Sequence, residues 1–205
     1  MIRGLDHVVL VVLDLAAAVA EHRARGFTVT PGGEHAGGLT HNALVGFQDG
    51  SYLELLAFHD VAAARGRHSW APVAERGGGW ADFALLSNDL RQDVAALGEL
   101  VPRPPEEGGR TRPDGLDIAW RVVRLAKPLP FLIEDLTARE LRVPSGNATV
   151  HANATTGVAG IVVGASDPGR VGAGYAVLRD RGAPPIEVRG AERDGLIDVR
   201  FTGQR

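Results

Sequence analysis

The fold of this chain is decided by residues 5–26, LDHVVLVVLDLAAAVAEHRARG. An apolar strand opens this stretch, and Asp14 follows it where an aspartate can cap a helix by accepting free backbone N–H groups. Gly26 then stands where a helix would stop. Short β-rich runs come next, with glycine-rich turns between them, at residues 27–30, 42–47 and 52–58. This order predicts a β-α-β-β-β module over residues 1–58.

The order of apolar strand, aspartate and helix returns twice further along the chain. One apolar strand precedes Asp89, and another precedes Asp167. We therefore predict a second, βαβββ-like module over residues 80–136 and an abbreviated third module over residues 157–205. The expected fold class is α+β, with the repeated modules packed as one compact unit. The linker segments 59–79, 101–115 and 135–156 are expected to be active-site loops, because long irregular connections in compact domains usually serve a function.

The composition excludes several classes of protein. The chain has 205 residues, of which 44% are hydrophobic and 23% charged, and its formal net charge is −3. A chain this apolar can bury enough surface to fold, which excludes intrinsic disorder. It has no stripe of basic residues that would bind nucleic acid. It has no cysteine, so any metal must be held by nitrogen and oxygen. No apolar run is long enough to cross a bilayer, and we expect a cytoplasmic protein with no membrane partner.

Alternation along two strands points one histidine and one glutamate toward the same hollow. His7 shares a strand face with Val9, and Glu54 shares one with Leu56, while the opposite faces are aliphatic and suit packing under a helix. A buried imidazole and carboxylate must be paired, hydrogen-bonded or bound to metal. Together they form half of a site for a divalent ion such as Zn, Mn, Fe or Ni. A salt-bridged pair at a barrel mouth is the alternative.

Several stretches resemble a known superfamily. GLDHVVLVVLDLAAAVAEHRARGF and GLTHNALVGFQDGSYLELLAF are similar to the vicinal oxygen chelate superfamily, and more narrowly to its glyoxalase-like domain branch. GGGWADFALLSNDL, LPFLIEDL and HANATTGVAGIVVGASDP resemble the second half of that branch. The resemblance implies paired βαβββ modules whose mixed sheet curls into a cup around a divalent metal.

The resemblance also implies a set of ligands. His7 matches the ligand on the first strand, Glu54 the ligand on the fourth, and Glu134 the ligand on the last strand of the second module. The opening strand of the second module has no histidine, and this departure leaves the fourth ligand open. Asp82 is one candidate, by its register with His7, and His151 is the other.

Further side chains are expected to contact a substrate in the cup. These are His41, Asn42, Tyr52 and His151. His22 is expected to face solvent, and the remaining histidines fall in predicted loops and have no assigned role: His35, His59 and His68.

The implied chemistry is that of a Lewis acid. Two vicinal oxygens of a small metabolite would chelate the ion, which stabilises an oxyanion as charge develops. Glu54 or Glu134 would dissociate from the metal and transfer a proton of the substrate. This task requires that apolar surroundings raise the pKa of the carboxyl group toward neutrality. The sequence thus predicts a metal-dependent lyase or isomerase.

Two other functions remain open at this point. The first is a metal-free protein that binds or sequesters a small molecule in a cup lined by Tyr52, Trp70 and Trp80. The second is a non-catalytic module in which the third unit covers a sheet edge or the seam of a homodimer. The first two modules would close a cup either within one chain or across such a dimer.

Overall fold

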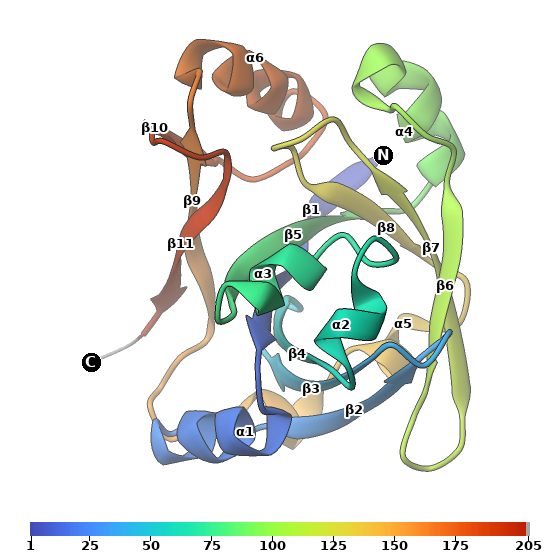
Figure 1. The fold of residues 1–205 in the computed structure, drawn as a ribbon, viewed down its shortest axis with the longest axis vertical. Helices are drawn as coiled ribbons and strands as arrows, with labels where there is room; N and C mark the ends of the chain where they lie inside the picture. The colour runs from blue at the N-terminus through green and yellow to red at the C-terminus, as the bar shows by residue number, and fades with distance from the viewer. Residues whose placement is uncertain (204–205) are drawn as a thin grey trace.

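In the computed structural model, which describes residues 1–203, eight strands close into a barrel in the order β1-β4-β3-β2-β6-β7-β8-β5 (Figure 1). The fold is α+β, and its curled mixed sheet forms the predicted cup within one chain. A separate three-stranded sheet lies beside the barrel in the order β10-β9-β11. The last two residues of the predicted third module lie outside the described residues.

The two halves of the barrel repeat one order of elements. The first half contains β1 (Ile2–Val12), α1 (Leu15–Ala24), β2 (Thr30–His35), β3 (Thr40–Gly46) and β4 (Tyr52–Phe58). The second half contains β5 (Gly79–Ser87), α4 (Leu90–Leu97), β6 (Glu106–Thr111), β7 (Asp117–Arg124) and β8 (Phe131–Asp135).

The remaining elements connect the halves or build the smaller sheet. The connections contain α2 (Val61–Ala64), α3 (Ala71–Glu75), α5 (Arg139–Arg142) and two short 3-10 turns (Gly98–Leu100 and Gly146–Thr149). The smaller sheet contains β9 (Gly157–Ala165), α6 (Pro168–Arg179), β10 (Glu187–Gly190) and β11 (Gly195–Thr202). No helix in the described part of the chain is long and apolar enough to span a membrane.

The three repeated aspartates cap helices, as the sequence predicts. Asp14, Asp89 and Asp167 each accept a backbone N–H three residues further on, at 3.0, 2.9 and 3.0 Å. Each side chain thereby satisfies a donor in the first turn that has no partner within the helix. The helices therefore begin where the sequence places them.

Two strands differ from the prediction. β2 begins at Thr30 and extends to His35, beyond the predicted run 27–30, and β6 lies in a segment expected to be a loop. They pair with each other and join the two halves of the barrel. Their sequences are polar and rich in glycine, so they lack the apolar alternation by which strands are predicted. Gly33, with φ of 139°, is needed at this seam because a Cβ there would lie 2.0 Å from the Thr111 carbonyl oxygen.

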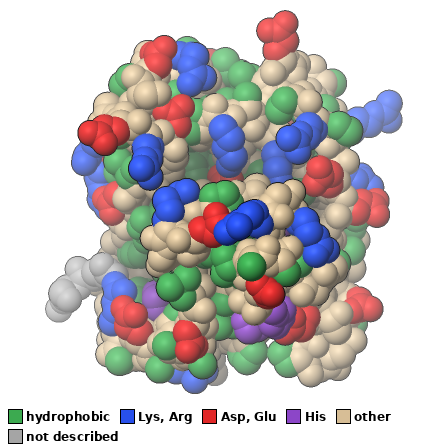
Figure 2. Space-filling model, viewed as in Figure 1, with side chains coloured by type: hydrophobic (Ala, Val, Ile, Leu, Met, Phe, Trp, Pro, Cys, Tyr) green, Lys and Arg blue, Asp and Glu red, His purple; other side chains and the backbone are tan. Residues whose placement is uncertain are grey.

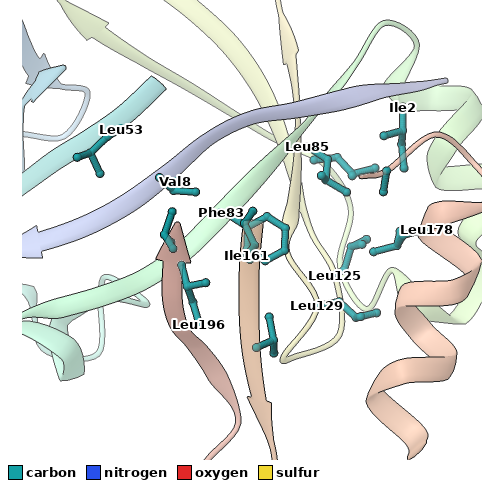
Figure 3. Packing of buried hydrophobic residues seen from close by; sticks show 14 of the residues in the cluster. Ile2, Val8, Leu53, Phe83, Leu85, Leu125, Leu129, Ile161, Leu178 and Leu196 are labelled. Atoms are coloured by element: carbon teal, nitrogen blue, oxygen red, sulfur yellow. The ribbon is translucent and has the colours of Figure 1, made fainter. Parts of the chain in front are cut away.

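The barrel carries a separate apolar core on each of its two faces. On the outer face, strands of the barrel pack against β9, β11 and α6, as Figure 3 shows around Val8, Phe83, Ile161 and Leu178. The inner face holds a smaller cluster that includes Trp70, at the start of α3. In Figure 1, α2 and α3 lie in front of the barrel strands. The segment 59–79, predicted as a functional loop, thus contributes to the interior of the barrel.

Candidate functional site

A cavity of about 250 Å³ lies inside the barrel, and both halves line it. The first half contributes His7, His35, Asn42, Tyr52 and Glu54. The second half and the connections contribute Trp70, Trp120, Phe131 and three arginines, Arg110, Arg124 and Arg142. The structure therefore brings His7 and Glu54 into one hollow, together with Asn42 and Tyr52.

His7 is held in one orientation by Asp6. Its Nδ1 lies 2.6 Å from Asp6 Oδ1, and its ring stacks on Tyr52 with centroids 4.5 Å apart. Strict alternation would place Asp6 on the opposite face, but the pairing of β1 with β5 shifts between Leu5 and His7. Such a bulge re-aims side chains, which accounts for the contact between adjacent residues.

Asp6 is ionised because arginines surround it. Burial alone would raise the pKa of Asp6, but the charge and hydrogen bonds of Arg142 outweigh burial and hold that pKa well below its usual range. Arg142 donates to both Asp6 oxygens at 2.9 and 2.8 Å and also donates to the Tyr52 hydroxyl. Arg139 donates to Asp6 as well. The His7 Nδ1 proton therefore points at a carboxylate, and this assignment of the tautomer follows from the hydrogen bonds.

Glu54 is also ionised. Asn42 donates to Glu54 Oε1 at 2.6 Å, and the Nε2 atom of His35 lies 3.4 Å from the same oxygen. Burial alone would raise the pKa of Glu54, but the hydrogen bond and charge of His35, with the charge of His7 and the Asn42 amide, lower it to about 2. This corrects the expectation of a raised pKa: polar neighbours, rather than the apolar wall, decide the charge of this group.

The residues present fit a divalent cation. His7 Nε2 faces Glu54 Oε2 at 3.7 Å. With Nδ1 donating to Asp6, a neutral His7 presents a lone pair to a carboxylate, so a proton or a metal ion is required between them. A carboxylate behind an imidazole is the arrangement that orients histidine ligands in metal sites. His7 and Glu54 are therefore the side chains that would hold the ion.

Glu134 does not join this pair, which corrects its place in the ligand set. Phe131 and Ile133 point into the cavity, so alternation along β8 turns Glu134 to the outer face. There its Oε1 accepts the Leu90 N–H at 3.1 Å, and its Oε2 lies 3.5 Å from Arg121. Glu134 thus stabilises the start of α4.

Neither candidate for the fourth ligand lines the cavity. Asp82 pairs with Lys127 and accepts the Phe83 N–H at 3.0 Å. His151 accepts the Thr28 N–H on Nδ1 at 3.0 Å, so its Nε2 donates to the Gly46 carbonyl at 2.9 Å. Both ring nitrogens of His151 are committed to the backbone, which also removes its expected role in substrate binding.

His41 also lies outside the cavity, which corrects its predicted contact with substrate. Its Nδ1 is 3.7 Å from Glu34, and Glu34 is 2.6 Å from His59 Nε2. Ligand atoms of these three side chains lie within 4.8 Å of one another, so they form a second group able to hold a metal. Figure 2 shows histidine side chains at the surface beside acidic ones in the lower half of that face. We call this group the surface cluster.

Sequence reasoning missed several side chains of the cavity, including Arg124 and Trp120 on β7. His35 and Arg110 lie opposite each other on β2 and β6, the two strands with weak sequence signals. Arg142 belongs to α5, in a segment predicted as a linker. The one local signal for His35 is the pair Glu34-His35 after two glycines, because adjacent residues of a strand point to opposite faces.

Comparison with known proteins agrees with this architecture. A family model described as a glyoxalase-like domain matches residues 5–178. A hypothetical protein from Staphylococcus aureus is similar in structure, with a TM-score of 0.72 and 13% identity over 93% of this chain and 87% of that one. No curated protein matches the chain.

Two methylmalonyl-CoA epimerases are similar over part of the chain. The one from Streptomyces coelicolor, in complex with 2-nitronate-propionyl-CoA, has a TM-score of 0.49 and 21% identity over 67% of this chain and 100% of that one. The one from Mycobacterium tuberculosis has a TM-score of 0.45 and 18% identity over 65% of this chain and 89% of that one.

Proposed function

Because the chain belongs to the glyoxalase-like domain family of the vicinal oxygen chelate superfamily, we propose that it is a metal-dependent lyase or isomerase acting on a small oxygenated metabolite. The observation that carries this proposal is the His7 Nε2 atom facing the Glu54 carboxylate at 3.7 Å. Zn, Mn, Fe and Ni all suit nitrogen and oxygen ligands. In this proposal the reaction begins with removal of a proton beside a substrate oxygen.

Each residue of the site has a distinct task in this proposal. A bound ion supplies Lewis acidity that stabilises negative charge on a substrate oxygen. Glu54, which is ionised throughout the physiological range of pH, serves as a ligand. Asp6 fixes the ring of His7 so that Nε2 points inward.

His35 is the side chain to which we assign proton transfer. Glu54 is too weak a base for this task, because a group with a pKa of about 2 holds a proton poorly near neutrality. The imidazole of His35 can both accept and donate a proton at a ring nitrogen, which suits the task better. His35 lines the cavity, and its Nδ1 is anchored by the Thr40 hydroxyl at 2.9 Å.

Elemental analysis of protein purified without chelator tests the metal site. We expect stoichiometric metal in the wild type, and its loss in His7→Ala and Glu54→Gln. His59→Ala is the matched control because it disrupts only the surface cluster, and it should keep the metal. Metal retained by His7→Ala and lost by His59→Ala would place the ion on the surface cluster and overturn the proposal.

A second candidate function is favoured by the aromatic walls of the cavity. Tyr52, Trp70, Trp120 and Phe131 all line it, which suits a cup that binds a flat ligand without metal. Trp80, also expected in this lining, instead packs against the outer apolar core. Without metal, His7 would be protonated on both ring nitrogens, with Nδ1 facing Asp6 and Nε2 facing Glu54. A shift in tryptophan fluorescence on ligand binding that is unchanged by chelator, in protein free of metal, would favour this function.

A further inference from the structure

Two arginines line the cavity without an acidic partner. Arg110 projects from β6 and Arg124 from β7. Within residues 1–203, neither guanidinium has a carboxylate oxygen within 4.0 Å. Arg142, in the same cavity, instead pairs with Asp6 and Asp135. The cavity thus holds positive charge that the protein itself does not neutralise at close range.

Arg110 is the more deeply buried of the two. Its relative exposure is 5%, its Nη2 donates only to the Arg142 carbonyl at 2.8 Å, and its Nε has no partner. It lies opposite His35 in the pairing of β2 with β6. The charge of Arg110 therefore stands next to the side chain to which we assign proton transfer.

Arg124 lies against the aromatic wall. Its guanidinium carbon is 5.5 Å from the Trp70 ring centroid and 5.7 Å from that of Phe131, and its Nη1 has no partner. The other side of this wall reaches His7, whose ring centroid is 5.5 Å from that of Phe131. Phe131 thus lies between the Arg124 guanidinium and the His7 ring, and all three line the same cavity.

Within residues 1–203, the acidic side chains that line the cavity form no ion pair with Arg110 or Arg124. Glu54 is engaged by Asn42, and Glu106 and Glu107 are exposed, with Glu107 paired to Arg121. A buried charge without a partner is costly, and a bound anion removes that cost. The planar fork of a guanidinium matches a carboxylate in particular.

We propose that the substrate is a small organic acid whose carboxylate pairs with Arg124, while Arg110 adds positive charge beside the reacting oxygen. This inference names the substrate class for the proposed function and rests on it for the reaction. Binding itself is measured without turnover. The cavity volume of about 250 Å³ restricts the ligand to a small molecule.

Tryptophan fluorescence reports binding, because two of the three tryptophans, Trp70 and Trp120, line the cavity. The probes are lactate, malonate and succinate, each compared with its neutral amide in low-chloride buffer. We expect the acids to bind roughly tenfold or more tightly than the amides, as charge-assisted hydrogen bonds allow. Equal affinity for acids and amides, or no binding of any acid, overturns the inference.

Substitutions of single arginines test which of them binds the carboxylate of the probe. Arg124→Gln and Arg110→Gln should each weaken binding of the acids and leave the amides unaffected. Arg121→Gln is the matched control, because Arg121 lies on the same strand as Arg124, does not line the cavity and is paired with Glu107 and Glu134. Arg124→Lys keeps the charge and should retain part of the affinity. Wild-type affinity in both glutamine variants overturns the assignment.

The two proposals fail in distinguishable ways. Acid binding that persists in protein without metal, combined with no metal in the wild type, removes the proposed function and leaves this inference intact. Metal bound by His7 and Glu54, combined with equal affinity for acids and amides, removes this inference and leaves the metal site intact. Circular dichroism of each variant confirms that a loss of binding is not a loss of folding.

Discussion

At the scale of single residues, the charge of Glu54 follows from its neighbours. This side chain is 7% exposed, and burial by itself would favour its neutral form. The His35 and His7 rings and the Asn42 amide favour the charged form, and they prevail. Glu54 is therefore an anion near neutral pH, which suits a metal ligand better than a base.

Because the pKa of Glu54 falls from 4.5 to about 2 on folding, its charge contributes stability above the unfolded value, and this is lost as the pH falls through the folded value. We expect Glu54→Gln to be less stable than the wild type at neutral pH, and the difference to shrink as the pH falls from about 4.5 to about 2. Urea unfolding with chelator at each pH measures it. Glu192→Gln, an exposed control, should change stability by less than about 0.5 kcal/mol throughout. A difference that stays constant with pH contradicts the lowered pKa.

At the scale of elements, the seam between β2 and β6 decides the composition of the site. Each of these strands supplies a cavity residue, His35 from β2 and Arg110 from β6. Neither strand has the apolar alternation typical of a half-buried strand, because glycines and charges occupy it. The pairing between them is set by closure of the barrel rather than by their own sequences.

Glu134 links two elements, because this residue of β8 accepts a hydrogen bond from the first residue of α4. We expect Glu134→Ala to lower the free energy of unfolding by about 1 kcal/mol, since the Leu90 N–H loses its acceptor. Metal content should not change. Glu134→Gln keeps an acceptor oxygen and should be closer to the wild type. Loss of metal in Glu134→Ala, measured by elemental analysis, would return this residue to the ligand set.

At the scale of the whole molecule, the smaller sheet and the barrel share one apolar core. Leu178 of α6 is fully buried in the cluster that also contains Val8 of β1 and Phe83 of β5 (Figure 3). A core that spans both parts couples their stability, because neither can expose its face to water without cost. We therefore propose that residues 1–203 unfold as one unit.

Leu178→Ala tests this coupling. Removing a fully buried leucine should lower the free energy of unfolding by about 2–5 kcal/mol. The transition should stay single, with barrel tryptophan fluorescence and far-UV circular dichroism changing together. Val177→Ala, at a neighbouring position that is 43% exposed, is the control and should have little effect. Two separate transitions would mean that the smaller sheet unfolds independently of the barrel.

The sequence by itself determined the features that depend on neighbours along the chain. Helix caps at Asp14, Asp89 and Asp167 need only a carboxylate and the next turn of backbone. The shared face of His7 with Val9 and of Glu54 with Leu56 needs only the two-residue period of a strand. The resemblance to a superfamily then supplied the curled barrel, which placed those two faces toward one hollow.

Only the tertiary structure decided which other side chains reach that hollow. His35, Arg110 and Arg142 enter it through pairing and packing between segments far apart in the chain, and a bulge in β1 brings Asp6 to His7. Glu134 lies outside the cavity because it points to the outer face of β8, where it accepts the Leu90 N–H. His151 lies outside because both of its ring nitrogens are hydrogen-bonded to the backbone. The pairing of distant strands depends on closure of the whole barrel, so the sequence of a single strand does not determine it.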